Sequence, residues 1–158
     1  MKNIILFASI ALASGLVFVN FYTSLVDVRS WGSDIPNSIA TAREYFKVSN
    51  PGNFFRTFSP INQVLALVVL ILFWKTSPSI RLLLGAAFLM YIVAEGLTFM
   101  YFFPRNDFMM KNALLNDVDQ LKKTVSEWNT MNHVRTFILL IGVSLSFISL
   151  HKIYSLNH

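Results

Sequence analysis

The sequence predicts an all-α integral membrane protein: a bundle of four transmembrane helices with an extracytoplasmic amphipathic helix and a long first connection. Of the 158 residues, 54% are hydrophobic and only 13% are charged, whereas a soluble domain has about 25% charged residues. Four apolar stretches approach the roughly 20 residues that a helix needs to cross a bilayer. We therefore predict one domain, 1–158, with spans at about 4–22, 60–74, 81–103 and 134–150.

The same composition argues against several functional classes. The chain has no cysteine, so disulfides and thiolate metal sites are ruled out. Its net charge of +5 is spread among the apolar stretches and forms no basic stripe, which argues against nucleic acid as a partner. His151 and His158 are expected on the opposite side from His133, and one histidine with one carboxylate falls short of the usual three or four metal ligands. No phosphate-binding loop or dinucleotide fingerprint is present. We expect no metal, no cofactor, and the lipid bilayer as the surrounding medium.

The first span follows Lys2 and contains the triplet 11–13 (ALA), features that also occur in signal peptides. The apolar run continues well beyond that triplet, so we predict a retained helix. Asn20, near its far end, should face the interior of the bundle. In the connection 23–59, a short helix is expected with Pro36 in its first turn and with Ser33 or Asp34 as its cap. Connections this long usually have a role, and we expect this one to cover one end of the bundle.

The second span should begin inside that connection, near Phe54, and it has Asn62 close to its start. Only the turn at 75–79 separates it from the third span, so the two form an antiparallel hairpin. The third span contains a single ionisable residue, Glu95. Helical spacing places this residue on one face with Tyr91 and Phe99. A carboxyl group inside a span is costly and normally faces the protein interior. A hydrogen-bonded neutral acid, a structural ion pair and a ligand-binding or catalytic role all remain open for it.

Pro104 is expected to end the third helix. The segment Asp107 to Trp128 then shows an amphipathic pattern, and we expect this helix to lie over the mouth of the bundle. Its apolar positions are Met110, Leu114, Val118, Leu121, Val125 and Trp128. The fourth span has small residues along one side, at Gly142, Ser146 and Ser149, which predicts a helix-packing seam.

Charge predicts the orientation. The side that holds both termini and the 75–80 turn has basic residues and no acid: Lys2, Lys75, Arg81 and Lys152. Positively charged residues favour the cytoplasmic side, so both termini are predicted to be cytoplasmic.

This topology gathers the unusual polar residues near one level. Glu95, Asn20, Asn62, His133 and Arg135 all fall near the predicted outer surface. Arg135 is expected to pair with Glu95, and His133 is a candidate proton acceptor near neutral pH. Each also has a structural explanation: an interfacial anchor for Arg135, and simple solvent exposure for His133. Trp128 is likewise typical of an aromatic belt.

Two short motifs carry a family resemblance: residues 104–107 (PRND), after the third span, and residues 128–136 (WNTMNHVRT), before the fourth. They resemble the anthrone-oxygenase-like family of small four-helix membrane proteins. The resemblance implies a mostly uncharacterised family in which some members oxidise polycyclic aromatic anthrones with oxygen and no evident cofactor. It also implies Asn106, Trp128, His133 and Arg135 as site residues. The role of Glu95 rests on burial alone.

Together these arguments predict a polar site for a flat apolar or aromatic ligand, with oxygenase-like chemistry. The candidate catalytic residues are Glu95, His133 and Arg135. The candidate ligand-binding residues are Tyr91, Phe99, Asn106, Trp128, Asn132, Asn20 and Asn62. The alternative is a non-enzymatic accessory subunit that docks a membrane-protein partner in an envelope complex. An exposed apolar face on the outer segments favours the accessory subunit, and a closed pocket reaching Glu95 favours the ligand site.

Overall fold

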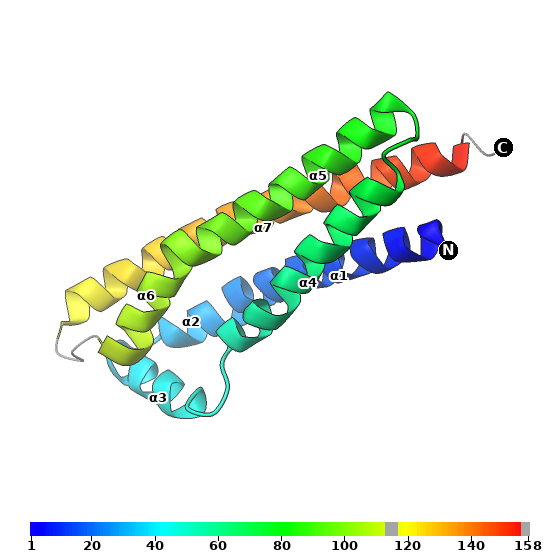
Figure 1. The fold of residues 1–158 in the computed structure, drawn as a ribbon. Coiled ribbons are helices and arrows are strands. Elements are labelled where there is room, and N and C mark those ends of the chain that lie inside the picture. Colours follow the sequence, from blue (N-terminus) through cyan, green and yellow to red (C-terminus); the bar gives the residue numbers. More distant parts are fainter. Residues whose placement is uncertain (113–116, 156–158) are drawn as a thin grey trace.

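Four long helices make up most of the structure, a computed structural model that describes residues 1–112 and 117–155 (Figure 1). Each is long and apolar enough to cross a membrane. They are Lys2–Trp31, Pro51–Leu72, Pro78–Lys111 and Val118–Ser155. This confirms the predicted all-α, four-span architecture of an integral membrane protein.

Three of these helices contain shorter elements. The first consists of α1 (Lys2–Tyr22), the π-helical turn η1 (Thr23–Asp27) and α2 (Val28–Trp31). The short α3 (Asn37–Tyr45) follows, and then α4 (Pro51–Leu72). The third helix joins α5 (Pro78–Leu97), the π turn η2 (Thr98–Phe102), α6 (Phe103–Asp107) and the π turn η3 (Phe108–Asn112). The last helix, α7 (Val118–Ser155), is continuous.

The helices form a closed ring in which each has two neighbours. α5 packs along α7, α7 along α1, α1 along α4, and α4 along α5. The start of α1, the end of α7 and the α4–α5 turn lie at one end of the bundle, and α3 lies across the other end, which we call the α3 end (Figure 1). Arg43 of α3 donates to the backbone oxygen of Met109 from Nε at 2.9 Å and from Nη2 at 2.7 Å. This joins α3 to the tip of the third helix.

The predicted packing seam along α7 is confirmed. The Tyr91 ring lies against Gly142, where an added Cβ would come within 2.5 Å of Tyr91 Cε1. The Tyr91 hydroxyl and Ser146 Oγ are 3.1 Å apart, and Ser149 is fully buried. The small side chains of α7 therefore let the backbones of α5 and α7 approach closely.

Four details of the prediction were wrong. Pro104 does not end the third helix, which continues to Lys111. Proline lacks an N–H group and collides with the preceding turn of an α-helix. Here the preceding turn is the π-helical η2, and local π adjustments let membrane helices accommodate proline.

The second error concerns the helix expected at 107–128. Its latter part is the beginning of α7, continuous with the fourth span, because no glycine or proline interrupts residues 118–141. Its apolar stripe is nevertheless buried, at Leu121, Val125 and Trp128. Leu114, predicted on the same stripe, lies outside the described residues.

The other two errors fall in the first connection. The first helix continues to Trp31, just before Gly32, so much of the expected loop is helical. The N-cap position of α3 is Pro36, with no capping side chain. The Asp34 carboxylate instead accepts a 3.0 Å hydrogen bond from the Asn37 side-chain amide.

Candidate functional site

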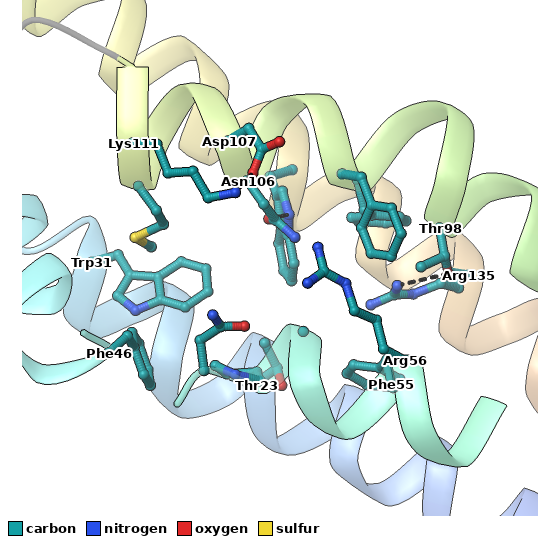
Figure 2. A pocket seen from close by; sticks show the side chains of 17 residues that line it. Thr23, Trp31, Phe46, Phe55, Arg56, Thr98, Asn106, Asp107, Lys111 and Arg135 are labelled. Carbon is teal, nitrogen blue, oxygen red and sulfur yellow. Dashed lines mark hydrogen bonds and ion pairs between the residues drawn. The ribbon is translucent and has the colours of Figure 1, made fainter. Parts of the chain in front are cut away.

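A cavity of about 190 Å³ lies at the α3 end of the bundle (Figure 2). We call it the large cavity because it is the larger of the two that Arg135 lines. A surface groove of about 460 Å³, lined by residues between 27 and 46, has a greater volume but does not include Arg135. Its lining comes from the first helix, α4, the third helix and α7, and from Phe46 just after α3. The residues that line it are Thr23, Trp31, Phe46, Asn50, Pro51, Gly52, Phe55, Arg56, Thr98, Phe102, Phe103, Asn106, Asp107, Met110, Lys111, Trp128 and Arg135.

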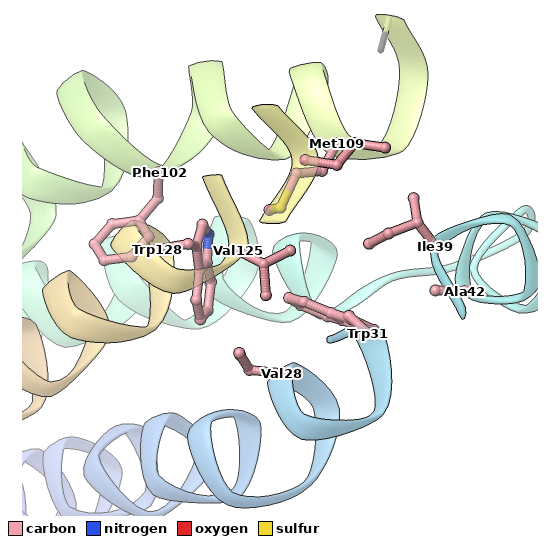
Figure 3. Close-up of a cluster of buried hydrophobic side chains, with 9 residues drawn as sticks. Val28, Trp31, Ile39, Ala42, Phe102, Met109, Val125 and Trp128 are labelled. Atoms are coloured by element: carbon pink, nitrogen blue, oxygen red, sulfur yellow. The ribbon is translucent and has the colours of Figure 1, made fainter. Parts of the chain in front are cut away.

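Aromatic rings form much of the wall. Trp128 packs edge-on against Trp31, with ring centroids 5.5 Å apart, and against Phe102 at 5.1 Å. Trp31, Val125 and Trp128 lie next to one another in the buried cluster beside the cavity (Figure 3). Trp128 Nε1 donates a 2.7 Å hydrogen bond to Asn106 Oδ1. Since this bond holds the indole in place, the cavity presents a fixed aromatic surface suited to a flat ring system.

Arg135 forms the polar part of the wall. The residue is only 4% exposed, and its guanidinium lies 3.9 Å from the Phe102 ring centroid and 5.0 Å from that of Phe55. Nη1 donates to Thr98 Oγ1 at 3.2 Å, the bond drawn in Figure 2, and Nη2 donates to Asn132 Oδ1 at 2.6 Å. Aromatic faces and hydrogen bonds thus compensate a buried cation in the wall of this cavity.

Asn132 connects this cation to the first helix. Its Nδ2 donates to the backbone oxygen of Asn20 at 3.0 Å and to Ser24 Oγ at 2.7 Å. Ser24 belongs to η1, and Thr98 belongs to η2. Two π-helical turns therefore present their hydroxyl groups at the site, and such turns recur at functional sites.

Further charges border the large cavity. Arg56 extends from α4 into it and lies over the Phe103 ring, 4.9 Å from the centroid (Figure 2). Lys111 Nζ forms a 2.7 Å ion pair with Asp107 Oδ1. With Arg135, the lining holds three basic residues and one acid, which favours an anion or a ligand that acquires negative charge.

A second, much smaller cavity of about 10 Å³, here called the polar chamber, lies behind Arg135. Phe55, Thr98 and Arg135 line both cavities, whereas Glu95 lines only the polar chamber. Glu95 is half-buried, and its carboxyl group interacts with the Ser59 hydroxyl and, electrostatically, with Arg135. Among the described residues, no direct ion pair joins Glu95 to Arg135.

The structure divides the predicted site residues into three sets. Asn106, Trp128 and Arg135 line the large cavity. Asn20, Asn62, Tyr91, Glu95 and again Arg135 line the polar chamber, and Asn132 is buried behind the guanidinium.

The third set lies outside both linings. Phe99 is 57% exposed on the outer surface of the third helix, and His133 is also exposed. Neither side chain is among those that line the two cavities. The ligand-stacking role predicted for Phe99 and the proton-accepting role predicted for His133 therefore have no geometric support.

Sequence reasoning missed Trp31, Phe55, Arg56 and Lys111 as lining residues. The only signal in the sequence for these lining residues was their position near the ends of apolar stretches. The lengths of the helices decide which of these ends lie side by side, and the predicted lengths of the first and third helices were too short.

A metal site and a surface that docks a partner protein are two other functions that can be compared with the geometry of the α3 end. Within residues 1–112 and 117–155, no group of three histidine, aspartate or glutamate side chains comes together in a way that could hold a metal ion. An exposed apolar face on the outer segments was expected to favour partner docking, but Ile39 of α3 and Leu121 and Val125 of α7 are buried inside the chain's own cluster.

Comparison with known proteins gives one family. Residues 52–145 match the family model described as anthrone oxygenase. No curated protein and no solved structure matches the chain. The matched region contains α4, the third helix and the part of α7 that carries Trp128, Asn132 and Arg135.

Proposed function

The chain belongs to the anthrone oxygenase family, and from this premise we propose that it oxidises a flat polycyclic aromatic compound with molecular oxygen in the large cavity. The observation that carries the proposal is the buried Arg135 guanidinium in the wall of an aromatic cavity. A cation in such a place stabilises negative charge that develops on a bound apolar molecule.

The walls suit such a substrate. Trp31, Phe102 and Trp128 offer ring surfaces, and Asn106 fixes the Trp128 indole. A planar polycycle would lie against these rings, with its carbonyl oxygen directed to Arg135. Arg56 and Lys111, at the border of the cavity, add positive charge for phenolate or carboxylate substituents.

The chemistry balances with oxygen as the only co-reactant. A base removes one proton from the substrate CH₂ group, and the remaining electron pair delocalises onto the carbonyl oxygen as an enolate beside Arg135. The carbon of this enolate transfers electrons to O₂ and forms a C–O bond, which gives a peroxide anion. That anion takes back the proton, and the hydroperoxide loses water to leave a second carbonyl group.

We assign the base role to Glu95 rather than to His133. Glu95 lines the polar chamber together with Arg135, whereas His133 is exposed and lines neither cavity. Glu95 and Arg135 interact electrostatically, so the base and the group that stabilises the oxyanion lie close to each other.

The test uses the purified protein in lipid nanodiscs with anthrone as the probe. Oxygen uptake should exceed the protein-free rate, and mass spectrometry should find one ¹⁸O atom per anthraquinone formed under ¹⁸O₂. Arg135→Gln should reduce the rate by about 100-fold or more. The matched control is Arg81→Gln, because Arg81 also lies over an aromatic ring, 5.2 Å from the Trp74 centroid, but at the opposite end of the bundle. A rate no higher than that without protein, or equal loss in both variants, would contradict the proposal.

A further inference from the structure

The polar chamber gathers side-chain atoms that lack hydrogen-bond partners among the described residues. Asn62 is fully buried, and both its Oδ1 and its Nδ2 are unpaired. Asn20 Oδ1, Gln63 Oε1 and Arg135 Nε are buried and unpaired as well. All four residues line the chamber.

Such atoms are expensive to bury without a partner, and a native interior holds few of them. Five in one place, contributed by α1, α4 and α7, indicate a shared small polar ligand rather than scattered defects. The set has acceptors on Asn20, Asn62 and Gln63 and donors on Asn62 and Arg135. Water both donates and accepts, so it can pair with either kind, and one molecule relieves some of the five atoms, since it makes at most four hydrogen bonds.

The size of the chamber agrees with this. Its volume of about 10 Å³ is close to the least space that admits one water molecule, which typically makes about three hydrogen bonds. A larger polar ligand does not fit. An apolar molecule would leave the amide groups unpaired.

We propose that the polar chamber binds one ordered water molecule that links Glu95 to Arg135 and serves as a proton relay between the two cavities. Thr98 lines both cavities, so its hydroxyl is the connecting group. In this structure the hydroxyl donates to the Ala94 backbone oxygen at 3.0 Å, and in the relay it turns from that oxygen to the water. The substrate proton passes to Thr98 Oγ1 as the hydroxyl proton moves to the water, and a water proton moves to the Glu95 carboxylate. Each group keeps its proton count except substrate and carboxylate, and the reverse transfer protonates the peroxide anion. The relay rests on the proposed oxygenase function, but the water site does not.

The first experiment is independent of activity and compares Asn62→Leu with Asn53→Leu, an exposed position on the same helix. If the chamber holds water, Asn62→Leu removes partners of that water and lowers the unfolding midpoint. If the chamber is dry, removing two unpaired polar atoms raises the midpoint, and the water site is overturned. An experimental structure that resolves water should show a peak within hydrogen-bond distance of the Asn62 amide. A direct Asn20–Asn62 amide bond that closes the chamber would also overturn the proposal.

The relay is tested by turnover of anthrone in light and heavy water. Asn62→Leu should reduce turnover by at least about tenfold and change the solvent isotope effect, while anthrone affinity stays the same. Asn53→Leu should match the unmodified protein in all three measurements. Unchanged turnover and isotope effect in Asn62→Leu would exclude the relay. If the unmodified protein does not oxidise anthrone, the proposed function and the relay fail, and the water site is still decided by stability and structure.

Discussion

Arg135 Nη2 donates a 2.6 Å hydrogen bond to Asn132 Oδ1, which stands three residues earlier on the same face of α7. Asn132 in turn donates to the Asn20 backbone oxygen and to Ser24 Oγ on the first helix. One amide side chain therefore both helps to position the buried cation and joins two helices. Position 132 thus contributes both to the packing of the bundle and to the orientation of the proposed oxyanion-stabilising group.

The first prediction follows from these three hydrogen bonds. Asn132→Ala should lower the free energy of unfolding by about 2–4 kcal/mol, because it removes two donors and leaves a buried guanidinium partly unpaired. Denaturant unfolding in detergent micelles measures this value. Thr130→Ala is the matched control on α7, since Thr130 is exposed and bonds only within its own helix. A loss no larger than the control's would mean that Asn132 does not join the helices.

The second prediction concerns the approach of α5 and α7. A Cβ at position 142 would lie 2.5 Å from Tyr91 Cε1. Gly142→Ala should therefore lower the free energy of unfolding by about 1–3 kcal/mol, since a buried ring must move. Gly15→Ala is the control, because nothing lies within 4 Å of its added Cβ. That change should be neutral or stabilising by up to about 1 kcal/mol. Equal behaviour of the two variants would contradict the observed seam.

These cases indicate how far the sequence could lead. Hydrophobic length was enough to predict four spans, and the small residues on α7 predicted a packing seam, which the structure places against α5. Of the residues that the two motifs imply, Asn106, Trp128 and Arg135 line the large cavity, whereas His133 does not. Each of these features depends on residues that are close together in the chain, so periodicity and composition can predict it.

The errors arose where structure depends on more distant relations. Pro104 is a helix breaker in isolation, yet the π turn before it lets the third helix continue. Phe99 follows Glu95 by four residues, so a regular α-helix would place both on one face. Phe99 lies in the same π turn, which changes the helical spacing, and its side chain faces outward. Arg56 and Trp31 line the same cavity only because the helices extend beyond their apolar cores, and no short-range pattern in the sequence indicates this.

The third prediction concerns orientation. The sequence lacks cysteine, so single-cysteine variants report one position each. Val48 is 95% exposed at the α3 end, and Ser79 is exposed at the end that holds both termini. The basic residues of the latter end favour the cytoplasm. In intact cells, a membrane-impermeant maleimide should label Val48→Cys, and it should label Ser79→Cys only after permeabilisation. The reverse pattern would place the termini outside.

The last prediction concerns the coupling of Glu95 and Arg135. Their side chains interact electrostatically across the polar chamber without a direct ion pair. Glu95→Gln and Arg135→Gln should each destabilise the protein, because each leaves the other charge without its counter-charge. The double variant should lose less than the sum of the two, by roughly 0.5–2 kcal/mol, the range expected for groups in one network. Unfolding free energies of all four proteins in the same micelles give this coupling. The control cycle pairs Glu95→Gln with Arg81→Gln, which lies at the other end of the bundle and should give additive losses. Additive losses in the Glu95–Arg135 cycle would show that the two charges act independently, and Glu95 would then lose its place in the proposed site.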